Sequence, residues 1–294
     1  MIRLAIRVPR EHAEIVLAEL LELAPAGVEE VIVGDAVEYA VFGAPGELPR
    51  LPDLRALAGG ALVEVSTSEI PDDWHERWKE FHRAILIEPP AAQTPWRAPA
   101  LNIRPPWEHA HERSDGAVLE IVIDPGQAFG TGAHATTRLC LELLLELAAL
   151  ERPHGPVLDV GTGSGVLAIA AAALGFAPVV GLDNEQESVA AARENALVNG
   201  ADIEVRRFDL RSESLPHGAQ HDARPPILLA NLLRPLLLEL AVTLAWAPAE
   251  LIAGGLLREE LDEVSAAFAG QLGLRERERR SAGEWGALWL SGAG

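Results

Sequence analysis

The chain has 294 residues, 49% of them hydrophobic, and its mean hydropathy is +0.12. That length is sufficient for two domains, and the apolar content excludes a largely disordered chain. Forty-four acidic against 24 basic side chains give a net charge of −20. Such acidity keeps a protein soluble, disfavours binding to nucleic-acid phosphates and attracts cationic partners. The single cysteine, Cys140, excludes an intrachain disulfide or a thiolate zinc site.

No apolar run in the sequence reaches the roughly 20 residues needed to cross a bilayer. The first residues carry charges where a signal peptide has its apolar segment. We therefore expect a cytoplasmic protein with no membrane partner and no direct nucleic-acid partner. No pattern suggests an obligate assembly, so we expect a monomer.

The first 66 residues have the pattern of a small α+β domain. Alternating apolar residues predict four strands, over residues 2–8, 28–33, 37–42 and 61–66. Helical spacing predicts two helices, over residues 11–23 and 51–57. Gly34 and Asp35, between the two central strands, are a tight-hairpin signal. The order β-α-β-β-α-β is that of a ferredoxin-like fold, which does not by itself identify a function.

A tryptophan-rich segment and a proline-rich segment follow. Trp74, Trp78 and Phe81 would share one face of a helix, which either docks on a domain or binds a partner; docking is the commoner role. Six prolines then mark irregular chain between residues 89 and 106. We place a linker with a connecting helix over residues 67–95.

From residue 96 to the end, short apolar strands alternate with helices. Strands are predicted over 118–123, 157–160 and 179–182, and helices over 134–150, 165–174 and 187–199. This alternation is typical of parallel βαβ units. The sequence therefore predicts an α/β protein whose larger, Rossmann-like domain is doubly wound.

A glycine-rich turn follows the strand at 157–160. Gly161, Gly163 and Gly165 have the spacing G-x-G-x-G, whereas a dinucleotide fingerprint needs its third glycine where this chain has Val166. The next strand ends in Asp183, 22 positions after Gly161, where a carboxylate can accept hydrogen bonds from both ribose hydroxyls. A nucleoside without a pyrophosphate, such as that of S-adenosylmethionine, fits this pattern. Taken alone, Asp183 could instead cap the following helix.

Two further segments offer groups to such a ligand. Asp209 follows the next strand and either contacts the adenine amino group or is an ordinary loop residue. An earlier glycine and threonine cluster leads into the helix from His134, and hydroxyls and free N–H groups at a helix start suit the carboxylate of a methionine moiety. Thr136 or Thr137 can instead cap that helix. We expect His134 to be structural rather than catalytic.

Asn231 is the last candidate. It interrupts the apolar strand that begins at Pro226, near the carboxyl end where ligands bind in doubly wound sheets. Its amide offers one acceptor and two donors, so it can hold a substrate amine. A turn-forming role is the ordinary alternative for such an asparagine.

Together these segments resemble the PrmA-type methyltransferases that modify protein eleven of the large ribosomal subunit. The shared motifs are DPGQAFGTGAHATT from Asp124, VLDVGTGSGVLAIAA from Val157, GLDNE from Gly181, ANLL from Ala230, DDWHERWKEF from Asp72 and GEW from Gly283. The resemblance spans nearly the whole chain and is weakest over the first 66 residues. Two positions depart from the family pattern: Gln127 replaces an apolar residue, and residues 246–257 lack the usual Pro-Gly-Gly turn with its following Ser-Gly.

The resemblance implies an S-adenosylmethionine-dependent protein N-methyltransferase. It would act on lysine side chains and the α-amino terminus of that ribosomal protein, which the N-terminal domain would recognise. The implied cofactor-binding residues are Thr137, Gly161, Asp183 and Asn231. Phe129, Gly130, Thr131 and Gly163 of the same motifs, and Asp209 after the next strand, complete the candidate set. Asn231 would also orient the amine, and no metal is expected. Two alternatives stay open: a methyltransferase of another protein or a small molecule, and a partner-binding protein without turnover.

Overall fold

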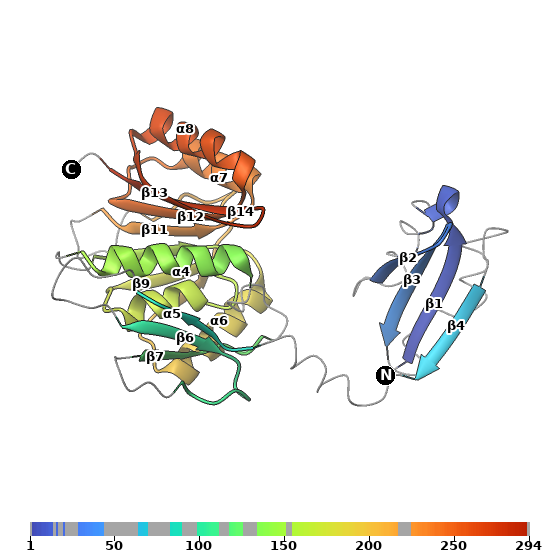
Figure 1. Ribbon diagram of the computed structural model, residues 1–294. Coiled ribbons are helices and arrows are strands. Elements are labelled where there is room, and N and C mark those ends of the chain that lie inside the picture. The colour runs from blue at the N-terminus through green and yellow to red at the C-terminus, as the bar shows by residue number, and fades with distance from the viewer. Residues whose placement is uncertain are drawn as a thin grey trace. The chain divides into compact units, whose positions relative to one another are not determined.

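The computed structural model describes residues 2–13, 16, 20, 29–43, 64–69, 83–89, 99–111, 118–125, 134–150, 155–216 and 225–292 (Figure 1). The chain divides into two compact units, Met1–Phe81 and His82–Gly294, which we call the N-terminal and C-terminal units. Within the described residues no helix has both the length and the apolar character needed to cross a membrane.

The N-terminal unit contains one four-stranded sheet. Its strands are β1 (Ile2–Pro9), β2 (Glu29–Val33), β3 (Ala36–Gly43) and β4 (Glu64–Glu69), and a short 3-10 turn, η1 (Arg10–His12), follows β1. Their order is β2-β3-β1-β4, and all neighbours are antiparallel. Because β1 lies between β3 and β4, the sheet has the arrangement of the predicted ferredoxin-like fold. β4 continues past residue 66, where the sequence places the end of this domain.

A helical face covers this sheet. Ala13, Val16 and Leu20 are helical and buried, at the spacing predicted for a helix over 11–23, and they pack with β-strand residues such as Ile6. The Tyr39 hydroxyl donates to Ala13 O over 3.0 Å and so joins the helix to β3. The helix predicted over 51–57 and the Trp74–Phe81 stripe lie outside the described residues.

The C-terminal unit is built on a seven-stranded sheet. Its strands are β8 (Val157–Val160), β9 (Val179–Asp183), β10 (Glu204–Arg207), β11 (Ile227–Asn231), β12 (Glu250–Leu257), β13 (Arg275–Ala282) and β14 (Trp285–Ser291). The order is β10-β9-β8-β11-β12-β14-β13; the first five strands are parallel, and β14 is antiparallel to both neighbours. The chain order reverses between β8 and β11, so the predicted doubly wound α/β fold is confirmed.

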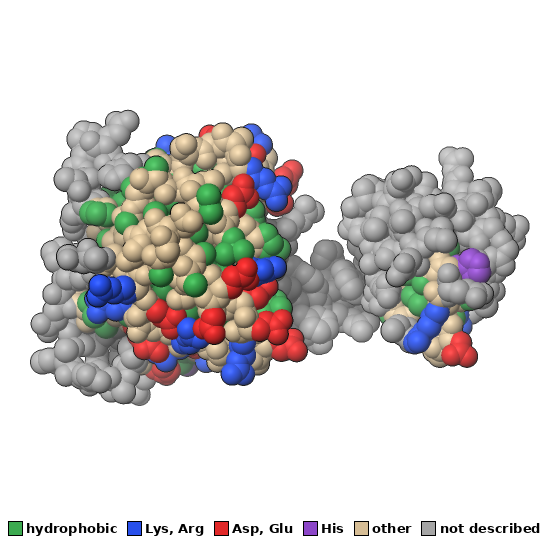
Figure 2. All heavy atoms as spheres, turned by 90° about the horizontal axis from the view of Figure 1, so that it is seen from above, with side chains coloured by type: hydrophobic (Ala, Val, Ile, Leu, Met, Phe, Trp, Pro, Cys, Tyr) green, Lys and Arg blue, Asp and Glu red, His purple; other side chains and the backbone are tan. Residues whose placement is uncertain are grey.

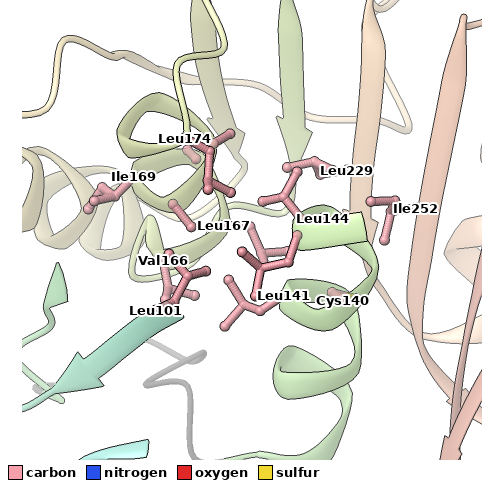
Figure 3. Close-up of a cluster of buried hydrophobic side chains, with 14 of the residues drawn as sticks. Leu101, Cys140, Leu141, Leu144, Val166, Leu167, Ile169, Leu174, Leu229 and Ile252 are labelled. Atoms are coloured by element: carbon pink, nitrogen blue, oxygen red, sulfur yellow. The ribbon is translucent and has the colours of Figure 1, made fainter. Parts of the chain in front are cut away.

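Helices cover both faces of the larger sheet (Figure 1). On one face lie α4 (Ala135–Ala148), α5 (Val166–Ala173) and α6 (Gln186–Asn199), and on the other lie α7 (Arg234–Thr243) and α8 (Leu261–Leu272), which a 3-10 turn, η3 (Arg258–Glu260), precedes. Side chains of α4 and α5 meet Leu229 and Ile252 from the strands in one buried cluster (Figure 3). Each fully buried leucine or isoleucine there contributes about 1.5–3 kcal/mol relative to exposure.

A small third sheet packs on α4 and α5. It consists of β5 (Ile85–Ile87), β6 (Ala100–Arg104) and β7 (Val118–Val122), with β6 antiparallel to β5 and parallel to β7. Its buried side chains belong to the same cluster as those of α4. β7 was predicted, but β5 and β6 were not. They are short and lie among many prolines, so their residues show no clear alternation of apolar and polar side chains. β5 lies within the segment that we predicted as a linker.

The edge strand β13 has the solvated surface that its alternating charges indicate. Arg279 pairs with Glu276 and with Asp262 of α8, and the first seven residues of β13 are mostly exposed. On the face of the C-terminal unit shown in Figure 2, acidic side chains likewise lie among basic ones. Exposed pairs of this kind contribute little to stability, so this surface gives no sign of a binding site.

Candidate functional site

The predicted site residues that the structure describes lie near the carboxyl ends of the parallel strands. A cavity of about 210 Å³ lies there, at the ends of β8 and β9. A larger cavity of about 1060 Å³ lies at the opposite, amino ends of these strands, and its described lining includes no predicted site residue. Ligands in doubly wound sheets bind at the carboxyl ends, beside the strands where the order reverses. We therefore take the smaller cavity as the candidate site.

The glycine-rich turn after β8 has a backbone conformation that residues other than glycine rarely adopt. Gly161, Gly163 and Gly165 have φ of +73°, +54° and +84°, in the left-handed region that glycine adopts without strain. The N–H groups of Gly161 and Thr162 both donate to Leu182 O of β9, over 2.8 and 3.0 Å. The G-x-G-x-G pattern is thus required by the shape of the turn.

Asp183, the last residue of β9, has a fixed carboxylate. Its Oδ2 accepts from Gly163 N over 2.9 Å, and its Oδ1 accepts from Glu185 N over 3.0 Å. Glu185 is the N-cap residue of α6, and no side chain caps the first turn of that helix. Asp183 therefore does not cap α6 in the ordinary way; its two hydrogen bonds orient the carboxylate beside the glycine turn.

The cavity brings three predicted residues together. Gly161, Asp183 and Asp209 all line it. The other lining residues are mostly apolar: Val160, Leu182, Asn184, Phe208, Leu210, Arg211, Leu232 and Leu236. Leu232 packs directly against Gly161 in the cavity wall, and a Cβ on Gly161 would collide with its side chain. A carboxylate beside apolar walls suits a nucleoside, whose ribose is polar and whose base is flat and apolar.

Asp209 lies at the cavity and also stabilises its own loop. Its Oδ1 accepts from Arg211 N over 3.0 Å, and its N–H donates to Glu213 Oε1 over 2.9 Å. The hydrogen bond from Arg211 holds the pKa of Asp209 below its usual range. Asp209 is thus a loop residue that also lines the cavity, and its contact with the adenine amino group stays a prediction.

The start of α4 has a different cap from the one expected. His134 is the N-cap residue; its Nδ1 accepts from Thr136 N over 3.4 Å and lies 2.9 Å from Thr136 Oγ1. The imidazole also makes an edge-to-face contact with Trp285, at 4.8 Å between ring centres. The possibility that Thr136 or Thr137 caps this helix is therefore wrong, and His134 has a structural role.

Asn231 and Thr137 meet although 94 positions separate them. Asn231 Nδ2 donates to Thr137 Oγ1 over 3.2 Å. Asn231 Oδ1 is buried and has no hydrogen-bond partner among the described residues. Leaving a buried acceptor unpaired costs about 1–3 kcal/mol, so this oxygen is suited to receive a donor from a ligand.

Gly254 of β12 makes room for this pair. It lies opposite Asn231 in the parallel ladder, and a Cβ there would be 2.9 Å from Asn231 Oδ1 and would collide with Cys140. Residues 250–257, part of the segment that departs from the family pattern, form a regular strand up to Ala253, with a bulge before Leu256. The departure therefore leaves the strand beside Asn231 intact.

Asp159 is a buried carboxylate beside the glycine turn that sequence reasoning missed. This β8 carboxylate is 1% exposed, and its Oδ2 accepts from Thr162 Oγ1 over 2.7 Å and from Ala168 N over 3.2 Å. Its Oδ1 has no hydrogen-bond partner among the described residues. Burial, with a further contribution from Asp183, raises the pKa of Asp159 to about 7. The available signal was a charged residue inside the apolar strand VLDV.

Replacing Asp159 with asparagine should change how stability depends on pH. Because the folded-state pKa lies above the ordinary value of 3.8, the stability from Asp159 is present below about pH 4 and is lost as pH rises through about 7. The loss approaches about 4 kcal/mol, and the uncharged asparagine avoids it. In urea unfolding, Asp159→Asn should therefore gain stability relative to the parent as pH rises from 5 to 8. If the free energies of unfolding of the parent and of Asp159→Asn change with pH in parallel, the raised pKa of Asp159 is contradicted.

The remaining predicted contacts cannot be placed. Phe129, Gly130 and Thr131, together with Gln127, lie outside the described residues. The described part of their motif consists of Asp124 and Pro125 at its start and the residues from His134 onward.

Comparison with known proteins identifies the family. The model of the family described as ribosomal protein L11 methyltransferase (PrmA) matches residues 56–291. A relative of that name from Dechloromonas aromatica is 33% identical over 299 residues, which is 94% of each chain. Another from Syntrophotalea carbinolica is 41% identical over 248 residues, 81% of this chain and 73% of that protein. A third, from Heliobacterium modesticaldum, is 39% identical over 228 residues, and the match covers 65% of its length.

A solved structure agrees with these matches. The crystal structure described as ribosomal protein L11 methylase from Lactobacillus delbrueckii subsp. bulgaricus is 34% identical to this chain, with a TM-score of 0.54. The similarity covers 66% of this chain and 95% of that one. The resemblance found in the sequence is confirmed, and the chain belongs to the ribosomal protein L11 methyltransferase (PrmA) family.

Proposed function

We propose that this chain transfers methyl groups from S-adenosylmethionine to amines of ribosomal protein L11. Family membership supports the reaction, and one structural observation supports the site most strongly. The fixed carboxylate of Asp183 and the open glycine turn border the same cavity, at the place where this fold binds nucleosides. The proposal places the enzyme in the cytoplasm as a monomer, and its net charge of −20 disfavours a nucleic-acid substrate.

The residues of the site fit S-adenosylmethionine. Asp183 would accept hydrogen bonds from the ribose, and the backbone of Gly161 forms part of the cavity wall beside it. Thr137 and Asn231 would bind the methionine part, where the unpaired Oδ1 of Asn231 is available to an ammonium donor. When bound, the cofactor supplies a methyl group on an electrophilic sulfonium.

The residues around the cavity must favour a neutral amine, because a protonated amine has no lone pair. At pH 7, deprotonating a lysine costs about 4.6 kcal/mol and an α-amine about 1.4 kcal/mol. Apolar walls such as Leu232 and Leu236 would penalise the charged amine and lower its pKa. The described residues that line the cavity include no histidine, cysteine or lysine. Positioning by Asn231 and desolvation would therefore drive the reaction, with the proton leaving to water.

Formation of S-adenosylhomocysteine tests this proposal directly. With S-adenosylmethionine alone, the chain should release little of this product; adding unmethylated L11 should start turnover. Release that is independent of L11 but requires a different protein or a small amine would assign another substrate. No release with any amine, despite cofactor binding, would contradict an enzymatic role.

The N-terminal unit would recognise L11. Among the described residues each unit has buried clusters of its own, so we expect the C-terminal unit to fold alone. A chain that begins at His82 should bind S-adenosylhomocysteine with unchanged affinity but show at least about a tenfold higher KM for L11, since a tenfold loss corresponds to only about 1.4 kcal/mol of contacts. Steady-state kinetics with L11 and calorimetry with S-adenosylhomocysteine measure the two quantities. An unchanged KM for L11 would remove the N-terminal unit from substrate recognition.

A further inference from the structure

Two asparagines on α6 bond to the chain that enters the first cofactor motif. Asn195 Oδ1 accepts from Asp124 N over 3.1 Å, and Asn195 Nδ2 donates to Ser164 O over 2.9 Å. Asn199, one helical turn later, accepts from Val122 N over 2.8 Å and donates to Val122 O over 2.7 Å. Asn199 Nδ2 also donates to Asn195 O of the same helix over 2.7 Å. Among the described residues outside α6, Asn199 therefore bonds only to Val122 of β7, whereas Asn195 joins two separate segments.

The two segments that Asn195 joins carry the two glycine-rich motifs of the sequence. Asp124 begins the motif DPGQAFGTGAHATT, and Ser164 lies in the glycine turn. They are 40 positions apart, and Asn195 is 31 positions beyond Ser164. The asparagine side chain is 3% exposed, so water cannot readily replace it. One amide thus links the backbones of both glycine-rich segments.

The packing around Asn195 makes the turn sensitive to this link. A Cβ on Gly165 would lie 3.1 Å from Ala192 Cβ, so the turn already sits close against α6 one turn before Asn195. Gly163, next to Ser164, donates the hydrogen bond that orients the Asp183 carboxylate. A shift of the Ser164 carbonyl would therefore move Gly163, its neighbour, and with it the Asp183 carboxylate that would bind the ribose.

We propose that Asn195 is a positioning residue for the cofactor, which sets the spacing between the segment that begins at Asp124 and the glycine turn. This role needs an acceptor for the N–H of Asp124 and a donor for the carbonyl of Ser164. A side-chain amide supplies both. Aspartate would keep the acceptor for Asp124 N but would place a carboxylate oxygen against the Ser164 carbonyl. The inference rests on the proposed function, because it assumes that both segments bind S-adenosylmethionine.

Asn199→Ala is the matched control for Asn195→Ala. Both variants lose side-chain hydrogen bonds that join α6 to neighbouring segments, so both should lower Tm. Only Asn195→Ala should weaken S-adenosylhomocysteine binding in calorimetry, by about tenfold, while Asn199→Ala stays within about twofold. In kinetics, Asn195→Ala should raise KM for S-adenosylmethionine and leave kcat at saturating cofactor near that of the parent. If Asn195→Ala does not fold, Asn195→Asp should show the same pattern.

The outcomes separate this inference from the proposed function. Equal affinities for Asn195→Ala and Asn199→Ala, whether both normal or both weakened, would overturn the positioning role and leave the function intact. A fall in kcat with an unchanged KM for cofactor would also overturn it. Absence of S-adenosylhomocysteine binding by the parent chain would overturn both.

Discussion

Asp183→Ala is expected to weaken binding of S-adenosylhomocysteine by about 100-fold. The variant loses the acceptor for the ribose hydroxyls and also the hydrogen bond that ties the carboxylate to Gly163 N at 2.9 Å. Hydrogen bonds to a charged group contribute about 1.5–3 kcal/mol each, and about 3 kcal/mol corresponds to a factor of about 100 in Kd. Isothermal titration calorimetry with S-adenosylhomocysteine measures the loss.

Asn184→Ala is the control for this prediction. Asn184 lines the same cavity and follows Asp183 directly, but our account gives its side chain no cofactor contact. Its replacement should leave Kd within a few-fold of the parent value. If both variants bind with parental affinity, the carboxylate at the end of β9 is not the ribose-binding group, and the location of the nucleoside must be revised.

Asn231→Ala is expected to lower kcat for methylation of L11 by about 100-fold at saturating cofactor. The variant removes a positioned amide whose Oδ1 is buried and unpaired among the described residues. Losing one such preorganised group at a reacting centre costs about 100- to 1000-fold in rate. Single-turnover kinetics with excess enzyme measure the chemical step without product release.

Thr137→Val tests the hydrogen bond that orients the Asn231 amide, while the amide itself stays in place. This change keeps the shape of the side chain but removes the Oγ1 that accepts from Asn231 Nδ2 at 3.2 Å. Asn231 would still be present but less firmly oriented, so we expect a decrease of about tenfold. A normal rate for Asn231→Ala, combined with weak cofactor binding by Asp183→Ala, would show that the cofactor site is correct and the amine site is not.

The sequence predicted the parts of the site whose signals are local. The G-x-G-x-G spacing predicted a glycine-rich turn after the strand, and Gly161, Gly163 and Gly165 all have positive φ there. Asp183 was predicted because the strand and its terminal carboxylate lie at a fixed distance from that turn. Both predictions depend on short stretches of chain in which few residue types are compatible with the backbone.

Contacts between distant segments could not be predicted in the same way. Nothing near Asn231 indicates that its partner is Thr137, because the pairing depends on α4 crossing the strand ends. The link from Asn195 to Asp124 and Ser164 arises likewise from three elements meeting. The raised pKa of Asp159 reflects burial under the turn, a property of the packed structure.

The prediction from the local sequence was also wrong at the start of α4, where the N-cap residue is of an uncommon type. Threonine is a far commoner N-cap than histidine, yet His134 caps α4 and packs against Trp285. That aromatic contact comes from β14, 151 positions later, and it fixes the imidazole at the helix start. The strands β5 and β6 were missed because neighbouring prolines hid their short alternation.

The intact mass of L11 tests the central claim most directly. Unmethylated L11 is incubated with S-adenosylmethionine and this chain, and in parallel with Asp183→Ala at a cofactor concentration far below its Kd. The account predicts stepwise gains of one methyl group in the mass of L11 with the parent chain and almost none with the variant. An unchanged mass with a parent chain that binds S-adenosylhomocysteine would contradict L11 as the substrate.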